Sequence, residues 1–169
     1  MYRCGECEFA YDLDRYGSAG DAISGGADEI ARLLGGHDRP ADDVVRTRPH
    51  PDVWSVLEYG GHVRDVLLVQ RERVLLARRV DCPSLPSMGR DERVEHDGYA
   101  EQSPVDVARQ LTDAAGLFVN VLDRLGPDDW DRSVVYNFPE PTERSLRWVA
   151  VHTEHEVRHH RLDVRRQLP

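Results

Sequence analysis

The C-terminal region concentrates four of the eight histidines in nine residues, 152–160. This run lies in a segment that begins near 142–145 and continues to about Arg166, with apolar residues at helical spacing. Projected at about 100° per residue, one arc holds Leu146, Val149, Ala150, Thr153, Val157 and Val164. The adjoining arc holds Trp148, His152, His155, His159 and Asp163. A helix with so wide a buried face must contact two neighbours, which predicts a helical bundle.

Three earlier segments also have helical signals. The first, 19–34, begins after Ser18, which forms a capping-box pattern with Asp21 three residues later. Its pair Gly25-Gly26 lowers the helix propensity of this segment. The second, 55–79, opens with Ser55 and Glu58, another capping box. The third starts at Ser103-Pro104 and closes at Gly126-Pro127. We therefore predict an all-α four-helix bundle as one domain over residues 18–169, with residues 1–17 as an N-terminal extension.

The connections are less regular. Residues 81–102 contain prolines and glycines without a convincing period, which predicts a long loop that can act as a lid or site wall. Residues 128–141 carry Trp130, Tyr136 and Phe138, so we expect this connection to pack against the bundle.

Composition excludes several classes of function. The formal net charge of −9 argues against a nucleic-acid surface, and no apolar run reaches the roughly 18 residues of a membrane span. The N-terminus lacks the pattern of a secretory signal, so a cytoplasmic location is expected. All 22 cationic side chains are arginines, which excludes a catalytic lysine.

The histidine spacing points to a divalent cation. His155 and His159 are four residues apart and lie one above the other on a helix. His62 shares the inward side of its helix with Val66 and Val69. A single inward histidine is usually a satisfied core residue, but several buried imidazoles are costly unless they are paired. His152 is the reserve ligand, whereas His160 points about 100° away from His159 and is expected to support a ligand or be exposed.

The run from His155 to His159 also matches the zincin pattern, in which Glu156 would be the general base. Only ten residues follow His159, with Asp163 as the sole downstream ligand candidate. A helical bundle also offers no edge strand to hold a peptide. Both points argue against a protease.

Cys4 and Cys7 have the spacing of half a zinc knuckle or of a redox pair. A second metal site here needs two further ligands, for which Cys82, His37 and His50 are the candidates. A plain reduced turn is the alternative.

These residues together resemble the DinB/YfiT-like superfamily of metal-binding four-helix bundles. The resemblance rests on Trp54-Ser55 opening a helix, on His62-Val63-Arg64-Asp65 within it, on the long loop, and on His155, His159 and Arg161 in the closing helix. It covers the chain from about Ser18. The Cys4/Cys7 extension and His160 depart from the common pattern.

The resemblance implies an up-down-down-up bundle, with the loop between the second and third helices as the crossover. It also implies zinc or nickel held by His62, His155 and His159. Characterised relatives are transferases of low-molecular-weight thiols and thiol-dependent isomerases that use bacillithiol or mycothiol. We therefore expect a metal-dependent S-transferase that joins a small thiol to a small electrophile.

Two other functions remain open. A metal hydrolase would use Glu156 or Asp65 as its base. A non-enzymatic, metal-stabilised or ligand-sensing bundle could form a homodimer through the Val157 side of the last helix.

Four further residues complete the predicted site. Asp65 and Asp163, each one turn beyond a predicted ligand, could hydrogen-bond the outer imidazole nitrogens or act on bound water. Arg90 and His96 in the long loop could bind a polar substrate.

Overall fold

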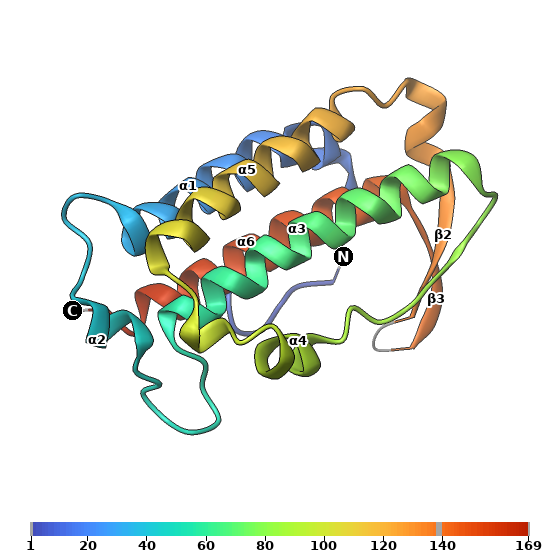
Figure 1. Ribbon diagram of the computed structural model, residues 1–169. Coiled ribbons are helices and arrows are strands. Elements are labelled where there is room, and N and C mark those ends of the chain that lie inside the picture. Colours follow the sequence, from blue (N-terminus) through green and yellow to red (C-terminus); the bar gives the residue numbers. More distant parts are fainter. Residues whose placement is uncertain (1, 138–139, 169) are drawn as a thin grey trace.

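The computed structural model describes residues 2–137 and 140–168, and its main feature is a bundle of four long helices (Figure 1). The predicted four-helix bundle is therefore confirmed, with boundaries close to those expected. The four helices are α1 (Ala19–Gly35), α3 (Val56–Arg79), α5 (Pro104–Leu122) and α6 (Leu146–Arg165).

Side-chain caps mark the starts of α3, α5 and α6. The capping box predicted for α1 does not form, because the Ser18 hydroxyl donates to the Arg15 carbonyl (3.0 Å) and makes no cap hydrogen bond. The Ser55 hydroxyl accepts the Glu58 N–H (3.2 Å), and the Glu58 carboxylate accepts the Ser55 N–H (2.8 Å). This is the predicted capping box, and it satisfies amides that have no partner within the helix. Ser103 caps α5 ahead of Pro104, and Ser145 caps α6.

The four helices share one apolar core. Helices α1 and α3 each pack against both α5 and α6, whereas α1 and α3 meet only slightly and lie diagonally opposite. Val157 of α6 is buried, so the Val157 side of the helix faces the bundle and is not available for the homodimer contact we expected. In the described ranges, no helix combines the length and apolarity needed to cross a membrane.

The purely α prediction needs correction, because a small sheet covers one end of the bundle (Figure 1). Strand β1 (Ser84–Leu85) pairs in parallel with β2 (Ser133–Asn137), which pairs antiparallel with β3 (Pro141–Ser145). Burial alternates along β2, but over only five residues. So short a pattern is easily missed. Trp130 and Tyr136 pack against the core as predicted, and Phe138 lies outside the described residues.

The predicted loop 81–102 is also partly ordered into elements. It contains β1, helix α4 (Arg90–His96) and the short helix η2 (Tyr99–Glu101). Gly89 and Gly98 have φ values of 67° and 56°, which side-chain-bearing residues rarely adopt, and each precedes one of these helices. The remaining elements are η1 (Leu13–Ser18), α2 (Asp42–Arg46) and η3 (Pro127–Asp131).

Candidate metal centre

The N-terminal segment folds back onto α6 and brings both thiols to it. Cys4 accepts the Glu8 N–H at its carbonyl and donates its own N–H to the Phe9 carbonyl, both at 2.9 Å, so a tight turn holds Cys4 and Cys7 together. The two cysteines and Phe9 form a small apolar cluster with Val151 of α6. Among the described residues, His155 and His159 lie beside these thiols, in place of the expected Cys82, His37 or His50. Local patterns do not indicate this pairing, because it joins residues more than 140 positions apart.

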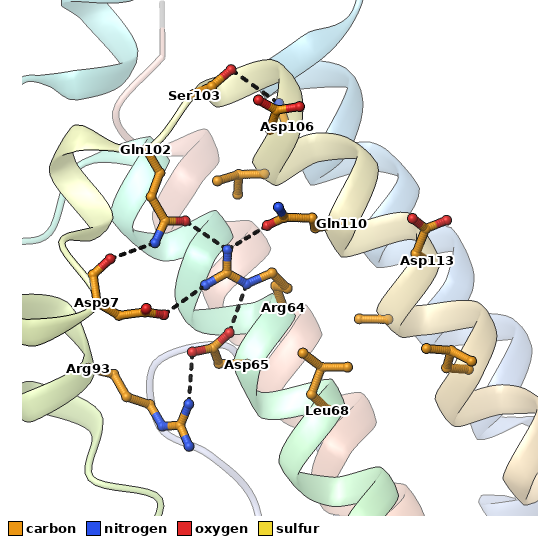
Figure 2. Close-up of a pocket in the computed structure, with 13 residues that line it drawn as sticks. Arg64, Asp65, Leu68, Arg93, Asp97, Gln102, Ser103, Asp106, Gln110 and Asp113 are labelled. Atoms are coloured by element: carbon orange, nitrogen blue, oxygen red, sulfur yellow. Dashed lines mark hydrogen bonds and ion pairs between the residues drawn. The ribbon is translucent and has the colours of Figure 1, made fainter.

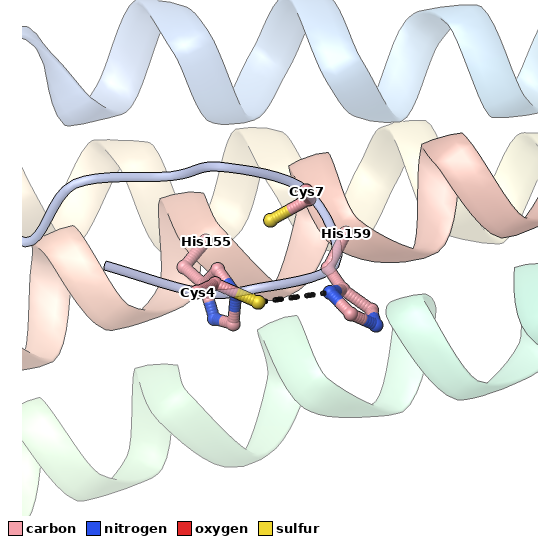
Figure 3. A group of neighbouring side chains, drawn as sticks. All are labelled: Cys4, Cys7, His155 and His159. Carbon is pink, nitrogen blue, oxygen red and sulfur yellow. Dashed lines mark hydrogen bonds between the residues drawn. The ribbon is translucent and has the colours of Figure 1, made fainter. Parts of the chain in front are cut away.

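Metal-ligating side chains gather in two main groups on neighbouring faces of α6. In each group, donor atoms from all members lie within 4.8 Å of one another. The His–Glu cluster consists of His62, Glu156 and His160. The thiol–imidazole cluster consists of Cys4, Cys7, His155 and His159 (Figure 3). His152, His155 and Glu156 form a third group that connects the two.

The structure therefore separates the residues of the predicted triad. His62 faces Glu156 and His160, whereas His155 and His159 face the cysteines; among the described residues, no group joins His62 to that pair. We expected His160 to be exposed or to support a ligand. It is not exposed, because only 15% of its side chain is accessible. Its ring packs nearly perpendicular to that of His62, with centroids 4.8 Å apart.

The His–Glu cluster has the charge states that suit a divalent cation. Burial, and then the neighbouring His160, lowers the pKa of His62 to about 3, so this imidazole is neutral. Burial would raise the pKa of Glu156, but hydrogen bonds from His155 and His160 hold it well below its usual value. The cluster therefore presents an ionised carboxylate.

His160 carries a proton in this state. Burial lowers the pKa of its imidazole, but Asp163 and Glu156 together raise it to about 9. The carboxylates beside His160 thus attract a positive charge, which a cation would supply in place of the proton.

One buried atom in the cluster lacks a partner. Nδ1 of His62 has no hydrogen bond, although an unpaired buried polar atom is costly. Two imidazoles and one carboxylate are also a ligand set found in catalytic zinc sites, where a further position stays open. The residues present therefore fit a divalent metal.

Of the two predicted supporting carboxylates, Asp163 lies at the histidines. Its Oδ2 is 3.1 Å from Nδ1 of His160 and 3.7 Å from Nε2 of His159. Asp163 thus orients an imidazole of each cluster, as carboxylates commonly do around metals.

Asp65 has a different role from the one predicted. Its carboxylate accepts hydrogen bonds from Arg64 (2.7 Å), Arg93 (3.0 Å) and the Tyr99 hydroxyl (2.7 Å). Figure 2 shows the contacts of Asp65 with the two arginines at a pocket of about 730 Å³ between α3 and α5, which has no histidine in its lining. Asp65 follows His62 by three residues, but its oxygens are occupied by these partners.

A second cavity, of about 470 Å³, opens over the His–Glu cluster. Arg90 lies in its wall, as predicted for a substrate-binding residue, with its guanidinium over the Trp54 ring at 5.4 Å. His96 does not line this cavity and instead borders a separate pocket beside α4. The cavity is lined by His62, Arg73, Pro86, Ser87, Met88, Gly89, Arg90, Asp91, Glu92, Tyr136, Asn137, His152, His155, Glu156, His159 and His160.

Sequence reasoning missed Tyr11. Its hydroxyl lies 2.9 Å from Nδ1 of His152 and 2.8 Å from Nδ1 of His155, so it orients both rings. Trp148, stacked on His152 at 4.4 Å, holds that ring from the other direction. No local pattern indicates Tyr11, because the N-terminal segment reaches α6 only through tertiary folding.

A four-helix bundle that converges imidazole and carboxylate donors from two helices on one cavity defines the class of protein: a metal-binding helical bundle. Residues 27–164 match the sequence profile of the DinB superfamily. The chain belongs to this superfamily, and the resemblance seen in its motifs is confirmed.

Among solved structures, the fold is similar to that of YfiT from Bacillus subtilis, with a TM-score of 0.80 and 13% sequence identity. The match covers 99% of this chain and 91% of YfiT, which is described as "a probable metal-dependent hydrolase with an unusual four-helix bundle topology". A comparison with curated proteins found no match.

Proposed function

We propose that this chain is a metal-dependent hydrolase whose divalent cation is held by His62, Glu156 and His160. The observation that carries the proposal is the convergence of these donors, one from α3 and two from α6, in the wall of a cavity. The description of YfiT as a metal-dependent hydrolase supports the same reaction class. This ligand set retains His62 of the predicted triad. It has Glu156 and His160 in place of the adjacent residues His155 and His159.

A bound divalent cation supplies Lewis-acid chemistry, which polarises a carbonyl or phosphoryl oxygen and lowers the pKa of water. The protein supplies a neutral imidazole beside it. Burial lowers the pKa of His152 to about 4, so this side chain stays uncharged and can orient a nucleophile by accepting its hydrogen bond. Its Nε2 lies 4.0 Å from Glu156, and Tyr11 fixes its orientation through Nδ1.

The cavity also indicates the kind of substrate. Its volume of about 470 Å³ lies within the range of small-molecule sites. Arg73 and Arg90 line it together with the carboxylates of Asp91, Glu92 and Glu156, so we propose that the substrate is a small polar molecule.

Thiol transfer is the second proposal, because a cation with an open position can also hold a small thiol as its nucleophilic thiolate. The same cavity would then receive the thiol and its electrophile, and zinc and nickel remain the proposed metals. The up-down-down-up order is likewise a proposal. It is supported by Figure 1, in which α3 and α5 both run from the α2 end toward the sheet.

Three expectations stay predictions: the separate status of residues 1–17, a cytoplasmic location and a homodimer.

The test is hydrolysis of small ester, amide and phosphate substrates by protein loaded with zinc or nickel. His62→Ala, Glu156→Gln and His160→Ala should each lower kcat/KM by more than the roughly 10- to 100-fold that loss of a residue supporting a ligand costs. His50→Ala, at an exposed position, is the matched control and should keep full activity.

Two outcomes would overturn parts of this proposal. If His155→Ala and His159→Ala abolish activity while Glu156→Gln and His160→Ala do not, the ligand set predicted from the sequence is the right one. If the loaded protein consumes a small thiol in the presence of an electrophile and hydrolyses nothing, the reaction is transfer and not hydrolysis.

A further inference from the structure

We propose that Cys4, Cys7, His155 and His159 form a second, closed zinc site, which fastens the N-terminal segment to α6. This site is separate from the His–Glu cluster and does not depend on the proposed hydrolase activity. Neither thiol belongs to the region that matches the superfamily, residues 27–164.

Ligand type and spacing provide the first argument. Two thiols in a C-x2-C turn and two imidazoles in an H-x3-H helical pair are ligand sets that structural zinc sites use. Bond lengths of 2.0–2.3 Å around a tetrahedral ion place neighbouring donors about 3.3–3.8 Å apart. Sγ of Cys4 lies 3.7 Å from Nδ1 of His159, and donor atoms of all four residues lie within 4.8 Å of one another (Figure 3).

Unpaired atoms in the site provide the second argument. Nε2 of His155 is buried without a hydrogen-bond partner, while its other ring nitrogen is in contact with the Tyr11 hydroxyl. Both thiols are buried, and no disulfide joins them in the structure. Thiols and an unpaired imidazole nitrogen gathered in one buried place are explained by a cation that all of them bind.

The surroundings supply the supporting contacts expected of a metal site. Nε2 of His159 lies 3.5 Å from Glu6 and 3.7 Å from Asp163, on the opposite edge of the ring from Cys4. The Tyr11 hydroxyl likewise contacts Nδ1 of His155, at 2.8 Å. Such contacts fix ring orientation and are typical around zinc-bound imidazoles.

Charge and coordination define what the site does. On binding Zn²⁺ each thiol releases its proton to water, and two thiolates balance the charge of the ion beside two neutral imidazoles. Four protein ligands leave no open position, so the site is structural and not catalytic. An isolated turn of this size is not stable in water. The zinc would therefore hold the segment that places Tyr11 against His152 and His155.

Cobalt(II) substitution tests the site on the whole chain. Thiolate ligands give Co²⁺ a charge-transfer absorption in the near ultraviolet, and tetrahedral geometry gives intense visible bands. We expect both in wild type. Cys4→Ser and Cys7→Ser should abolish the charge-transfer band and remove one equivalent of zinc, as measured by elemental analysis. Cys82→Ser, the same substitution at the remaining cysteine, should change neither.

The histidines separate this site from the His–Glu cluster. His159→Ala should weaken the thiolate charge-transfer band and lose one metal equivalent, whereas His160→Ala should keep that band and lose the other equivalent. Because the wild-type spectrum needs no variant, misfolding of a variant would leave the test intact. A wild-type cobalt spectrum without thiolate bands, a Cys4–Cys7 disulfide in the purified protein, or unchanged zinc content in Cys4→Ser would each overturn the proposal.

Discussion

At the scale of single residues, Asp65 has a structural role. Its side chain is 5% exposed and pairs with Arg64, whose side chain is 7% exposed. Arg64 also donates to the side-chain oxygens of Gln102 and Gln110, both at 2.7 Å. The carboxylate therefore neutralises a guanidinium that could not be buried alone.

Asp65→Asn should lower the free energy of unfolding by up to about 3–5 kcal/mol, because it leaves the buried Arg64 charge with only the more exposed and more distant Asp97 as an ionic partner. Metal content should remain that of wild type, since the network makes no contact with either cluster. Urea denaturation and elemental analysis measure the two quantities. Asp91→Asn, which breaks an exposed pair with Arg90, should cost about 1 kcal/mol or less. Loss of metal from the Asp65→Asn variant would contradict this role and show that Asp65 supports the metal centre.

Two adjacent glycines show how helix packing uses small residues. A Cβ built on Gly26 would lie 2.6 Å from Cγ1 of Val157 in α6, whereas one on Gly25 would meet nothing within 4 Å. Val157 is stiff about χ1 in a helix, so it cannot easily move away. Gly26 thus sets how closely α1 approaches α6, and Gly25 has no packing role.

Gly25→Ala should raise the free energy of unfolding by up to about 1 kcal/mol, the difference in helix propensity between the two residues. Gly26→Ala gains the same propensity but overpacks the α1–α6 contact, which typically costs about 1–3 kcal/mol, so its net effect should be destabilising. Thermal and urea denaturation of the two variants compare neighbouring positions in one helix. Equal stabilisation by both would show that α1 and α6 are less closely packed than described.

At the scale of the whole molecule, bound metal would connect parts of the chain that are distant in sequence. The His–Glu cluster connects α3 to α6, and the thiol–imidazole cluster connects the N-terminal segment to α6. Helix α6 is therefore the element on which both sites depend.

Chelation should lower the melting temperature, because a ligand bound only by the native state stabilises it by about 2.7 kcal/mol per site at a hundredfold excess over Kd. In His62→Ala the contribution of the His–Glu cluster should shrink, and with it the response to chelator. His50→Ala should respond like wild type. Scanning calorimetry with and without chelator measures the difference. A His62→Ala variant that loses as much stability on chelation as wild type would remove His62 from the metal site.

The sequence by itself determined the four helices, the caps of three of them and the gathering of metal-ligating side chains on the last helix. These features are local: Ser55 and Glu58 form their capping box within one turn, and the spacing of His155 and His159 is visible in five residues. The short strands were missed for two reasons. The pairing of β1 with β2 joins residues about 50 positions apart along the chain, and the neighbouring strands β2 and β3 are only five residues long, which is too short for a clear alternating pattern.

Only the tertiary structure decided which donors meet. Glu156 and His160 have the same four-residue spacing as His155 and His159, and one residue corresponds to a rotation of about 100° around the helix. Whether one pair or the other faces His62 depends on how α6 is rotated against α3 in the packed core. The return of Cys4 and Cys7 to α6 depends likewise on contacts more than 140 residues apart. Local patterns cannot specify either arrangement, because both are set by packing between distant segments of the chain.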